Sequence, residues 1–316
     1  MNVPVKNSDR FTPDLVDLWR ADGAVLLPSF FSAEEMEGVI RDFDQLFANA
    51  RPRSGSVVSL AASGQLDTLP REQFQLIRSM PFACSTALNL LSLHPAVIAF
   101  VRAALGTPDV RLYQNIAWAK YTGATDFDQP FHMDYFNHTL LAPGDVPSGK
   151  TVNLSIYATD ITNHHGAIHY VPRPQGDEIC GVLRPTTPGP AQQEALRRIE
   201  RSGAGSLGSV FAYSSDVYHR GTNLTVDNGH RYTLFAGYKS ADNTAVFGNP
   251  WPGAVPHLTG DGLWQPIFAQ ATPEQLTCLH IPSPGHPFWT PMTLARAQDR
   301  WPMWDLAPWR QALSMA

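Results

Sequence analysis

The chain has 316 residues and a net charge of −5; 43% of its residues are apolar and 16% are charged. An average soluble domain has roughly 25% charged residues, so this composition excludes a disordered or acidic-tail protein and provides material for a sizeable core. The basic residues are scattered along the chain. We therefore expect no polyanion-binding surface and no nucleic-acid partner.

The cysteine pattern and the apolar runs bear on location. Cys84, Cys180 and Cys278 are far apart and form no CxxC pair, which excludes a disulfide framework and suits a reducing cytosol. Apolar runs such as Ala24–Leu27 are far shorter than the roughly 20 residues that span a bilayer. Polar residues at 7–9 stand where a signal peptide needs an apolar segment. We therefore expect a cytoplasmic protein with no membrane partner.

Residues 1–108 are predicted to be mainly helical. Proline after a capping residue, with glycine at the end, predicts helices at 12–23 and 94–106, and a capping box opens a third at 32–47. A short apolar strand is expected at 24–28 and a loop at 51–68, which is rich in Ser, Gly and Ala.

Residues 109–240 change to short strands separated by Pro, Gly and Asn. The strands are predicted at 110–120, 129–135, 151–160, 167–171, 208–214 and 231–239, with a helical insertion at about 185–205. This arrangement is typical of an antiparallel barrel or jelly roll.

Residues 241–316 are rich in Trp and Pro and hold six of the eight tryptophans. Helix starts stand at Thr272-Pro273 and Thr290-Pro291. So many aromatic residues must be packed against something, so we expect a cover over the outer face of the barrel or a contact in a homodimer. We find no repeat and no linker, so 1–316 is expected to be a single domain.

His132 and Asp134 form the one His-x-Asp pair of the chain. Residues i and i+2 of an extended strand face the same side, so the imidazole and the carboxylate can be two corners of a metal site. We expect the third corner to be a histidine from a neighbouring strand, and His219 stands at the end of the strand that begins at 208. Two histidines and one carboxylate on one face bind iron(II) and leave positions open for oxygen chemistry.

Arg231 follows His219 by 12 residues, after a turn signal at 227–229, on the strand that returns antiparallel. Facing inward, it would be a buried cation that needs an anion, and its planar guanidinium suits a dicarboxylate. Thr233 shares its face and can add a hydroxyl donor. The pattern therefore predicts an anion site beside the metal site.

Several motifs stand in order over most of residues 11–240. They are Arg20-Ala-Asp-Gly-Ala-Val-Leu-Leu-Pro-Ser-Phe-Phe-Ser32, Lys120-Tyr-Thr-Gly123, His132-x-Asp134, Gly166-Ala-Ile-His-Tyr-Val-Pro172, and His219-Arg-Gly-Thr-Asn223 with Arg231. In this order they resemble the phytanoyl-CoA dioxygenase family of iron(II)/2-oxoglutarate oxygenases. The chain departs from the family at Arg173-Pro174-Gln175, where Gly-Ser-His is usual, and residues 176–207 are longer than is typical. We expect these departures to affect substrate choice more than the metal centre.

The resemblance implies a double-stranded β-helix with two sets of site residues. His132, Asp134 and His219 would bind iron(II), and Arg231 would bind the distal carboxylate of 2-oxoglutarate.

Further residues have a role only by family position or by their neighbours in the chain. Asn115 and Tyr157 would contact 2-oxoglutarate, with an ordinary core or surface role as the alternative for each. Tyr135 and Phe136 directly follow the acid ligand and are expected to wall the substrate side.

We therefore predict an α+β fold, with a jelly-roll (cupin-like) core buttressed by N-terminal and C-terminal helices. The expected enzyme is a dioxygenase that uses iron(II), 2-oxoglutarate and O2 to hydroxylate an unactivated carbon of a small molecule, such as one from secondary metabolism. Two alternatives stay open. The same oxidant could carry out desaturation, epoxidation or rearrangement, or the chain could be a non-catalytic jelly-roll binding protein.

Overall fold

A computed structural model describes residues 7–49, 76–122, 128–134, 150–181, 184–246 and 260–315. The loop predicted at 51–68 lies outside these ranges, as do Tyr135 and Phe136.

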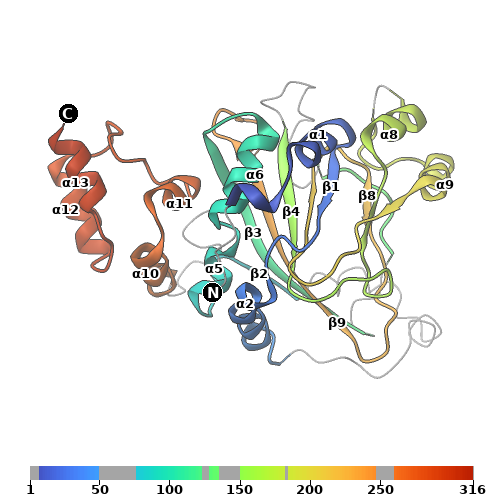
Figure 1. The fold of residues 1–316 in the computed structure, drawn as a ribbon, viewed down its shortest axis with the longest axis horizontal. Helices are drawn as coiled ribbons and strands as arrows, with labels where there is room; N and C mark the ends of the chain where they lie inside the picture. The colour runs from blue at the N-terminus through green and yellow to red at the C-terminus, as the bar shows by residue number, and fades with distance from the viewer. Residues whose placement is uncertain are drawn as a thin grey trace.

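A six-stranded antiparallel sheet in the order β1-β7-β4-β9-β3-β2 forms the centre of the molecule (Figure 1). Its strands are β1 (Ala24–Leu27), β2 (Ile77–Ser79), β3 (Val110–Tyr121), β4 (Thr151–Tyr157), β7 (Val210–Tyr213) and β9 (His230–Ser240). Every residue of β4 is buried, because the strand pairs with β7 and β9 on its two edges and is covered on both faces.

A smaller antiparallel sheet lies opposite and has the order β6-β5-β8. It is made of β5 (Ile168–Tyr170), β6 (Arg201–Ser202) and β8 (His219–Gly221). Together the two sheets form the double-stranded β-helix, so the predicted fold class is confirmed.

The strand predicted at 129–135 is reduced to a single bridge between His132 and His219. Pro130 has no backbone N–H to donate to a neighbouring strand. After His132, each residue makes its backbone hydrogen bond to a different segment. Met133 donates its N–H to Thr186 and Asp134 donates to Ser215, so the segment leaves β8 at once. The expectation of a full strand was therefore wrong for the described residues 128–134, although the chain there runs beside β8.

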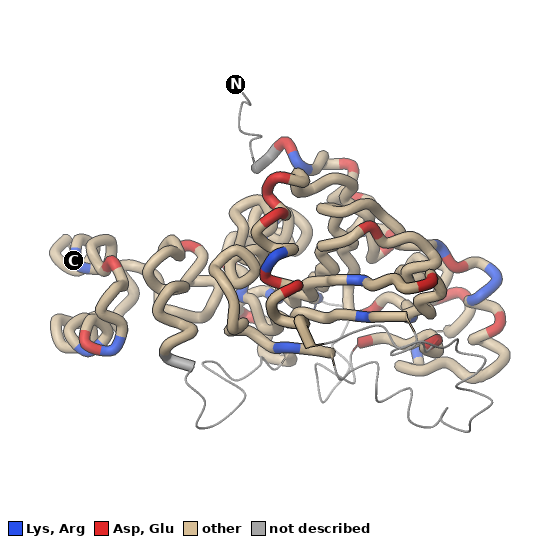
Figure 2. The backbone as a smooth tube through the Cα atoms, turned by 90° about the horizontal axis from the view of Figure 1, so that it is seen from below, with Lys and Arg blue, Asp and Glu red and all other residues tan. Residues whose placement is uncertain are grey.

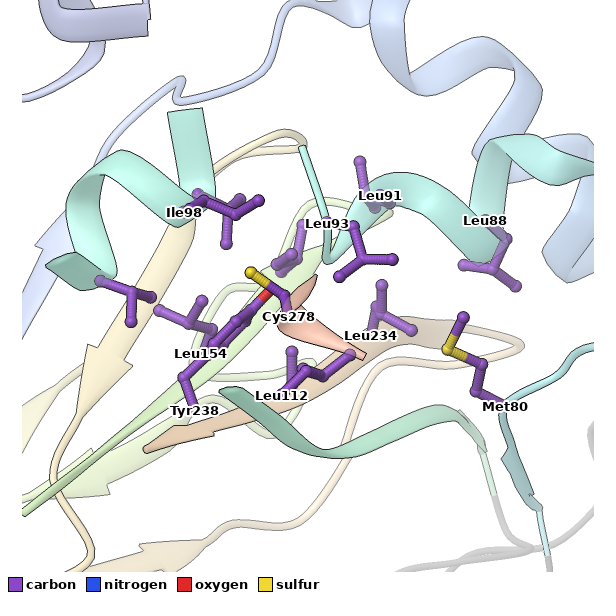
Figure 3. Close-up of a cluster of buried hydrophobic side chains, with 14 of the residues drawn as sticks. Met80, Leu88, Leu91, Leu93, Ile98, Leu112, Leu154, Leu234, Tyr238 and Cys278 are labelled. Atoms are coloured by element: carbon purple, nitrogen blue, oxygen red, sulfur yellow. The ribbon is translucent and has the colours of Figure 1, made fainter. Parts of the chain in front are cut away.

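Helices from the N-terminal third cover the outer face of the large sheet. They are α1 (Pro13–Asp22), α2 (Ala33–Leu46), α5 (Thr86–Leu91) and α6 (Pro95–Leu105), after a 3₁₀ turn, η1 (Asn7–Arg10). Figure 3 shows this interface, where Leu91 and Ile98 of the helices lie over Leu154 and Leu234 of β4 and β9. The apolar residues of alternate strand positions are thus buried under the helices.

Residues Thr86–Leu105 are long and apolar enough, by length and composition, to cross a membrane. The expectation that every apolar run is too short was therefore wrong for this segment. Within the fold it is divided into α5 and α6, and 61% of its most apolar window is buried inside the protein. Packing on the sheet accounts for its apolar residues.

Two helices lie on the side of the smaller sheet. The sequence predicted one of them: α9 (Pro190–Ile199) lies within the insertion expected at 185–205. The other is α8 (Arg173–Cys180), which starts with a proline in its first turn and was not predicted. Arg173 of α8 makes two hydrogen bonds of 2.8 and 2.9 Å to the carboxylate of Asp216. This ion pair ties α8 to the turn that leads into β8.

Four helices form the described part of the C-terminal region. They are α10 (Gly260–Gln270), α11 (Pro273–Cys278), α12 (Pro291–Arg300) and α13 (Ala307–Ser314). Figure 1 shows α10 and α11 beside α5, with α12 and α13 farther from the sheet, at the end opposite α8 and α9. In the side view of Figure 2, Lys and Arg segments are interspersed with Asp and Glu segments.

In this C-terminal region Trp289, Trp304 and Trp309 pack on one another, and Trp264 and Trp301 pack on Phe268. The rings of Trp304 and Trp309 are 4.8 Å apart, and the indole N–H groups of Trp289 and Trp309 both donate to the carbonyl of Pro282. The link to the sheet is made by α11 and the turn after it, where His280 donates to the carbonyl of Leu112. The tryptophans therefore belong to the same buried core as the N-terminal helices. The cover over the barrel or the homodimer contact expected of residues 241–316 stays a prediction.

Asp216→Ala should lower the free energy of unfolding by about 3–5 kcal/mol, because it leaves Arg173 without its buried partner. Burial alone would raise the pKa of Asp216, but the hydrogen bonds and charge of Arg173 outweigh it, and the pKa falls below its ordinary 3.8. The pair therefore contributes fully above about pH 4 and is lost as the pH falls through the lowered pKa. Urea unfolding of the wild type and of Asp216→Ala at several pH values measures this difference in stability.

The matched control is Glu194→Ala, which removes an exposed ion pair with Arg198 and should change the free energy of unfolding by less than about 0.5 kcal/mol.

Candidate functional site

His132, Asp134 and His219 lie close together and are all buried. Their potential ligand atoms lie within 4.8 Å of one another, and no other group of this kind is found among the described residues. His132 and Asp134 come from the extended segment 128–134, and His219 is the first residue of β8. The structure thus brings together the three residues that the sequence predicts as ligands.

Both histidines are held by the same local contact. Nδ1 of His132 lies 2.9 Å from the carbonyl oxygen of Pro130, and Nδ1 of His219 lies 2.9 Å from that of Val217. A carbonyl accepts only, so Nδ1 carries the proton and Nε2 keeps its lone pair. The two Nε2 atoms lie 3.8 and 3.5 Å from Oδ1 of Asp134. This is the arrangement of donor atoms that a divalent metal ion requires.

Burial and charge affect the two imidazoles differently. Burial, followed by the neighbouring His219, lowers the pKa of His132 and favours its neutral form. Burial also opposes a charge on His219, but Asp134 beside it outweighs this and raises the pKa of His219. A cation bound among the three residues would take the place of that proton, since a metal ligand must be neutral imidazole.

Asp134 is held by two residues that the sequence analysis missed. Its Oδ2 accepts hydrogen bonds from Nδ2 of Asn153 at 3.2 Å and from the hydroxyl of Tyr213 at 3.1 Å. The signal for Asn153 is the alternation of residues 151–157, in which every second residue is polar. Asn153 therefore shares the inner face of β4 with Tyr157, which was predicted.

Arg231 lies on the inner face of β9 and is buried. One guanidinium nitrogen donates to the carbonyl of Gly166, and the group lies 5.8 Å from the ring centre of Trp118. Within the part of the chain that the structure describes, its Nε has no hydrogen-bond partner and no carboxylate is paired with it. Burial lowers its pKa to about 10. A buried guanidinium in this state is a site for an anion.

Thr233 and Tyr157 lie side by side next to Arg231, since the two residues are paired in the register of β4 and β9. The hydroxyl of Thr233 is buried and has no partner among the described residues. The hydroxyl of Tyr157 already donates to the carbonyl of Gly203 at 2.6 Å. Lys120 of β3, the first residue of the Lys120-Tyr-Thr-Gly123 motif, is buried and is paired with Arg231 in the register of β3 and β9.

Asn115 does not belong to this group. It lies on the face of β3 that packs under the helices, and its Nδ2 donates to the hydroxyl of Ser92 at 2.9 Å. The inner face of β3 instead carries Trp118 and Lys120, which have the opposite parity. This placement favours the ordinary core role that was kept as the alternative to a contact with 2-oxoglutarate. Tyr135 and Phe136 stay predictions, because they lie outside the described residues.

Comparison with known families now decides the relationship. The family model for phytanoyl-CoA dioxygenase (PhyH) matches residues 19–227, about two thirds of the chain. The chain belongs to the phytanoyl-CoA dioxygenase family. It is accordingly an oxidoreductase of the iron(II)- and 2-oxoglutarate-dependent class. A search of the curated proteins found no match. The match ends before the C-terminal helices.

Solved structures share the fold at low sequence identity. One is the α-ketoglutarate-dependent epimerase SnoN from nogalamycin biosynthesis, with Fe3+, α-ketoglutarate and nogalamycin RO (16% identity, 77% of this chain and 91% of that chain, TM-score 0.55). Another is EctD from S. alaskensis with 2-oxoglutarate and 5-hydroxyectoine (19% identity, 77% and 83%, TM-score 0.56). A third is the carbocyclase SnoK (16% identity, 76% and 88%, TM-score 0.53). These matches agree with the jelly-roll architecture.

The residues present fit the two cofactors of the class. Nε2 of His132, Nε2 of His219 and Oδ1 of Asp134 offer three ligand atoms to iron(II). The unpartnered hydroxyl of Thr233 and the buried guanidinium of Arg231 fit a carboxylate of 2-oxoglutarate.

His219→Ala and Asp134→Ala should each abolish tight binding of one divalent metal ion per chain. In each variant the two remaining side chains are too few to hold the ion. Cobalt(II) titration followed by visible absorption, with protein unfolding measured in parallel, tests this. The matched control is His164→Ala: His164 is exposed and contacts the hydroxyl of Thr225. Equal cobalt binding by the control and by His219→Ala would contradict the assignment.

Proposed function

We propose that this protein hydroxylates an unactivated carbon of a small organic molecule, with His132, Asp134 and His219 as the iron(II) ligands. Iron(II) and 2-oxoglutarate supply the activation of dioxygen when they are bound. Nε2 of His132, Nε2 of His219 and Oδ1 of Asp134 would hold the metal.

The observation that carries this proposal is the burial of Arg231, whose guanidinium has no carboxylate partner among the described residues. A guanidinium without an anionic partner inside a barrel is unfavourable unless a ligand provides the anion. Arg231 and Thr233 would bind the distal carboxylate of 2-oxoglutarate, and so orient the molecule along the inner face of β9. Trp118 and Tyr157 flank this position and keep water away from the ion pair.

The substrate class is inferred from the chain and from its neighbours. The charged fraction is 16%, and the molecule has no basic cluster that would suit a coenzyme A phosphate. SnoN and EctD were solved with nogalamycin RO and with 5-hydroxyectoine, which are small molecules. A mildly polar small molecule therefore fits best. The cytoplasmic location and the homodimer stay predictions.

A second candidate reaction is rearrangement by the same oxidant. Among proteins of the same fold, SnoN is an epimerase and SnoK a carbocyclase. The mass of the product separates the reactions: hydroxylation adds one oxygen atom, ring formation or desaturation removes two hydrogens, and epimerisation leaves the mass unchanged.

Incubation with iron(II), 2-oxoglutarate and a panel of small molecules, with succinate and product mass measured together, tests the function. Succinate formation that one compound stimulates, with a gain of one oxygen, is the expected result. Without succinate from any compound, and with 2-oxoglutarate bound but not consumed, a non-catalytic binding protein would be the better account.

Arg231→Ala should weaken 2-oxoglutarate binding about 100-fold, since about 3 kcal/mol of paired charge is lost. The 2-oxoglutarate affinity of Arg231→Lys should lie between those of the wild type and Arg231→Ala, because lysine keeps the positive charge but loses the planar guanidinium. Both variants should still bind cobalt(II) as the wild type does. The dissociation constant of 2-oxoglutarate in the cobalt(II) protein measures the effect. The matched control is Arg111→Ala, since Arg111 is paired with Asp109 at the far end of β3. Unchanged 2-oxoglutarate binding in Arg231→Ala would show that this arginine binds something else.

A further inference from the structure

We propose that Asn153, Tyr113 and Tyr213 are positioning residues that hold Asp134 so that only one of its oxygens is offered to the metal. This inference rests on the proposed metal site and adds to it. It follows from four buried side chains that form one hydrogen-bonded chain in the barrel.

The two oxygens of Asp134 have different surroundings. Oδ1 faces Nε2 of His132 and Nε2 of His219, at 3.8 and 3.5 Å. Oδ2 is turned the other way and accepts from Asn153 and Tyr213. Both donors are neutral and almost fully buried, so they bind Oδ2 without cancelling the negative charge that the metal needs.

The amide of Asn153 can be oriented in only one way by its neighbours. The hydroxyl of Tyr113 donates to Oδ1 of Asn153 at 2.8 Å. This leaves Nδ2 of Asn153 to face Oδ2 of Asp134 and the hydroxyl of Ser215, both at 3.2 Å. Rotating the amide by half a turn would place its oxygen against the carboxylate of Asp134, which only accepts, whereas the Tyr113 hydroxyl can donate or accept. The carboxylate of Asp134 therefore sets the orientation of the amide, and the hydrogen bond from Tyr113 holds Asn153 in that position.

Tyr113 reaches Asn153 because the backbone of β3 is irregular there. The pairing of β3 with β9 shifts between Leu112 and Gln114, which leaves Tyr113 as the extra residue of a β-bulge. Its ring lies across Gly237 of β9, where an added Cβ would be 2.6 Å from the ring carbon Cζ. A bulge re-aims a side chain, and here the glycine makes the space for it.

The consequence concerns the positions left around the metal. A carboxylate with both oxygens free can turn and bind through both of them, which takes a position that a cosubstrate would use. Hydrogen bonds from Asn153 and Tyr213 oppose this rotation, because it would leave two buried donors without partners. The network therefore keeps Asp134 a one-oxygen ligand.

The experiment compares cobalt(II) affinity and the cobalt visible spectrum in wild type, Asn153→Ala, Tyr213→Phe and Tyr113→Phe. Asn153→Ala should weaken cobalt(II) binding roughly 10- to 100-fold, as is usual when a partner of a metal ligand is lost. Tyr113→Phe and Tyr213→Phe should weaken it less. All three should change the cobalt absorption, which reports the number of ligand atoms, and should weaken 2-oxoglutarate binding to the cobalt protein.

Two control variants remove similar buried groups on the helical side of the large sheet, away from the proposed metal site. Tyr238→Phe removes a hydroxyl that donates to the carbonyl of Ser92 at 2.7 Å on the helical side of the sheet. Asn89→Ala removes an amide of α5 that is hydrogen-bonded to Phe82. Both should lower the unfolding temperature as the test variants do, and both should leave cobalt(II) affinity and absorption unchanged.

The outcomes separate this inference from the proposed function. Absence of cobalt(II) binding by the wild type would overturn both. Wild-type binding together with unchanged affinity and absorption in Tyr113→Phe and Tyr213→Phe would overturn the inference alone. These two conservative variants decide the matter if Asn153→Ala does not fold. Equal losses in the test and control variants would also overturn it, since the effect would then be one of general stability.

Discussion

The site depends on one pair of backbone hydrogen bonds. His132 donates its N–H to the carbonyl of His219 at 3.0 Å, and His219 donates to that of His132 at 3.1 Å. This pair joins two segments that are distant in the sequence and sets their imidazole rings 4.6 Å apart. The ion pair between Arg173 and Asp216 supports the same place from outside, because it anchors the turn before His219.

Strand alternation explains why much of the site could be predicted from the sequence. His132 and Asp134 are two residues apart, and so are Arg231 and Thr233, so each pair had to share a face once the segments were extended. The order of the family motifs then indicated that the His132 and His219 segments lie side by side, which the alternation of residues along one strand cannot show. The helices with capping residues, proline starts and glycine ends were predicted for the same reason, since those signals are local.

Other features depended on tertiary packing. Asn115 was expected at the 2-oxoglutarate site by family position, yet it lies on the face of β3 where Ala117 and Ala119 pack closely under the helices. The bulge at Tyr113 was not visible, because a bulge depends on the register between two strands. The course of the C-terminal helices could not be predicted either, since aromatic density predicts burial and does not say against which surface.

The contact of Tyr113 with Gly237 has a consequence for how this barrel can vary. The two positions belong to different strands, and each limits the side chain that the other can carry. A sequence with a side chain at the position of Gly237 would have no room for the tyrosine ring, and would need another donor for Asn153. We therefore expect the two positions to covary. A glycine opposite a bulged tyrosine would mark those relatives that support the metal-binding carboxylate in this way.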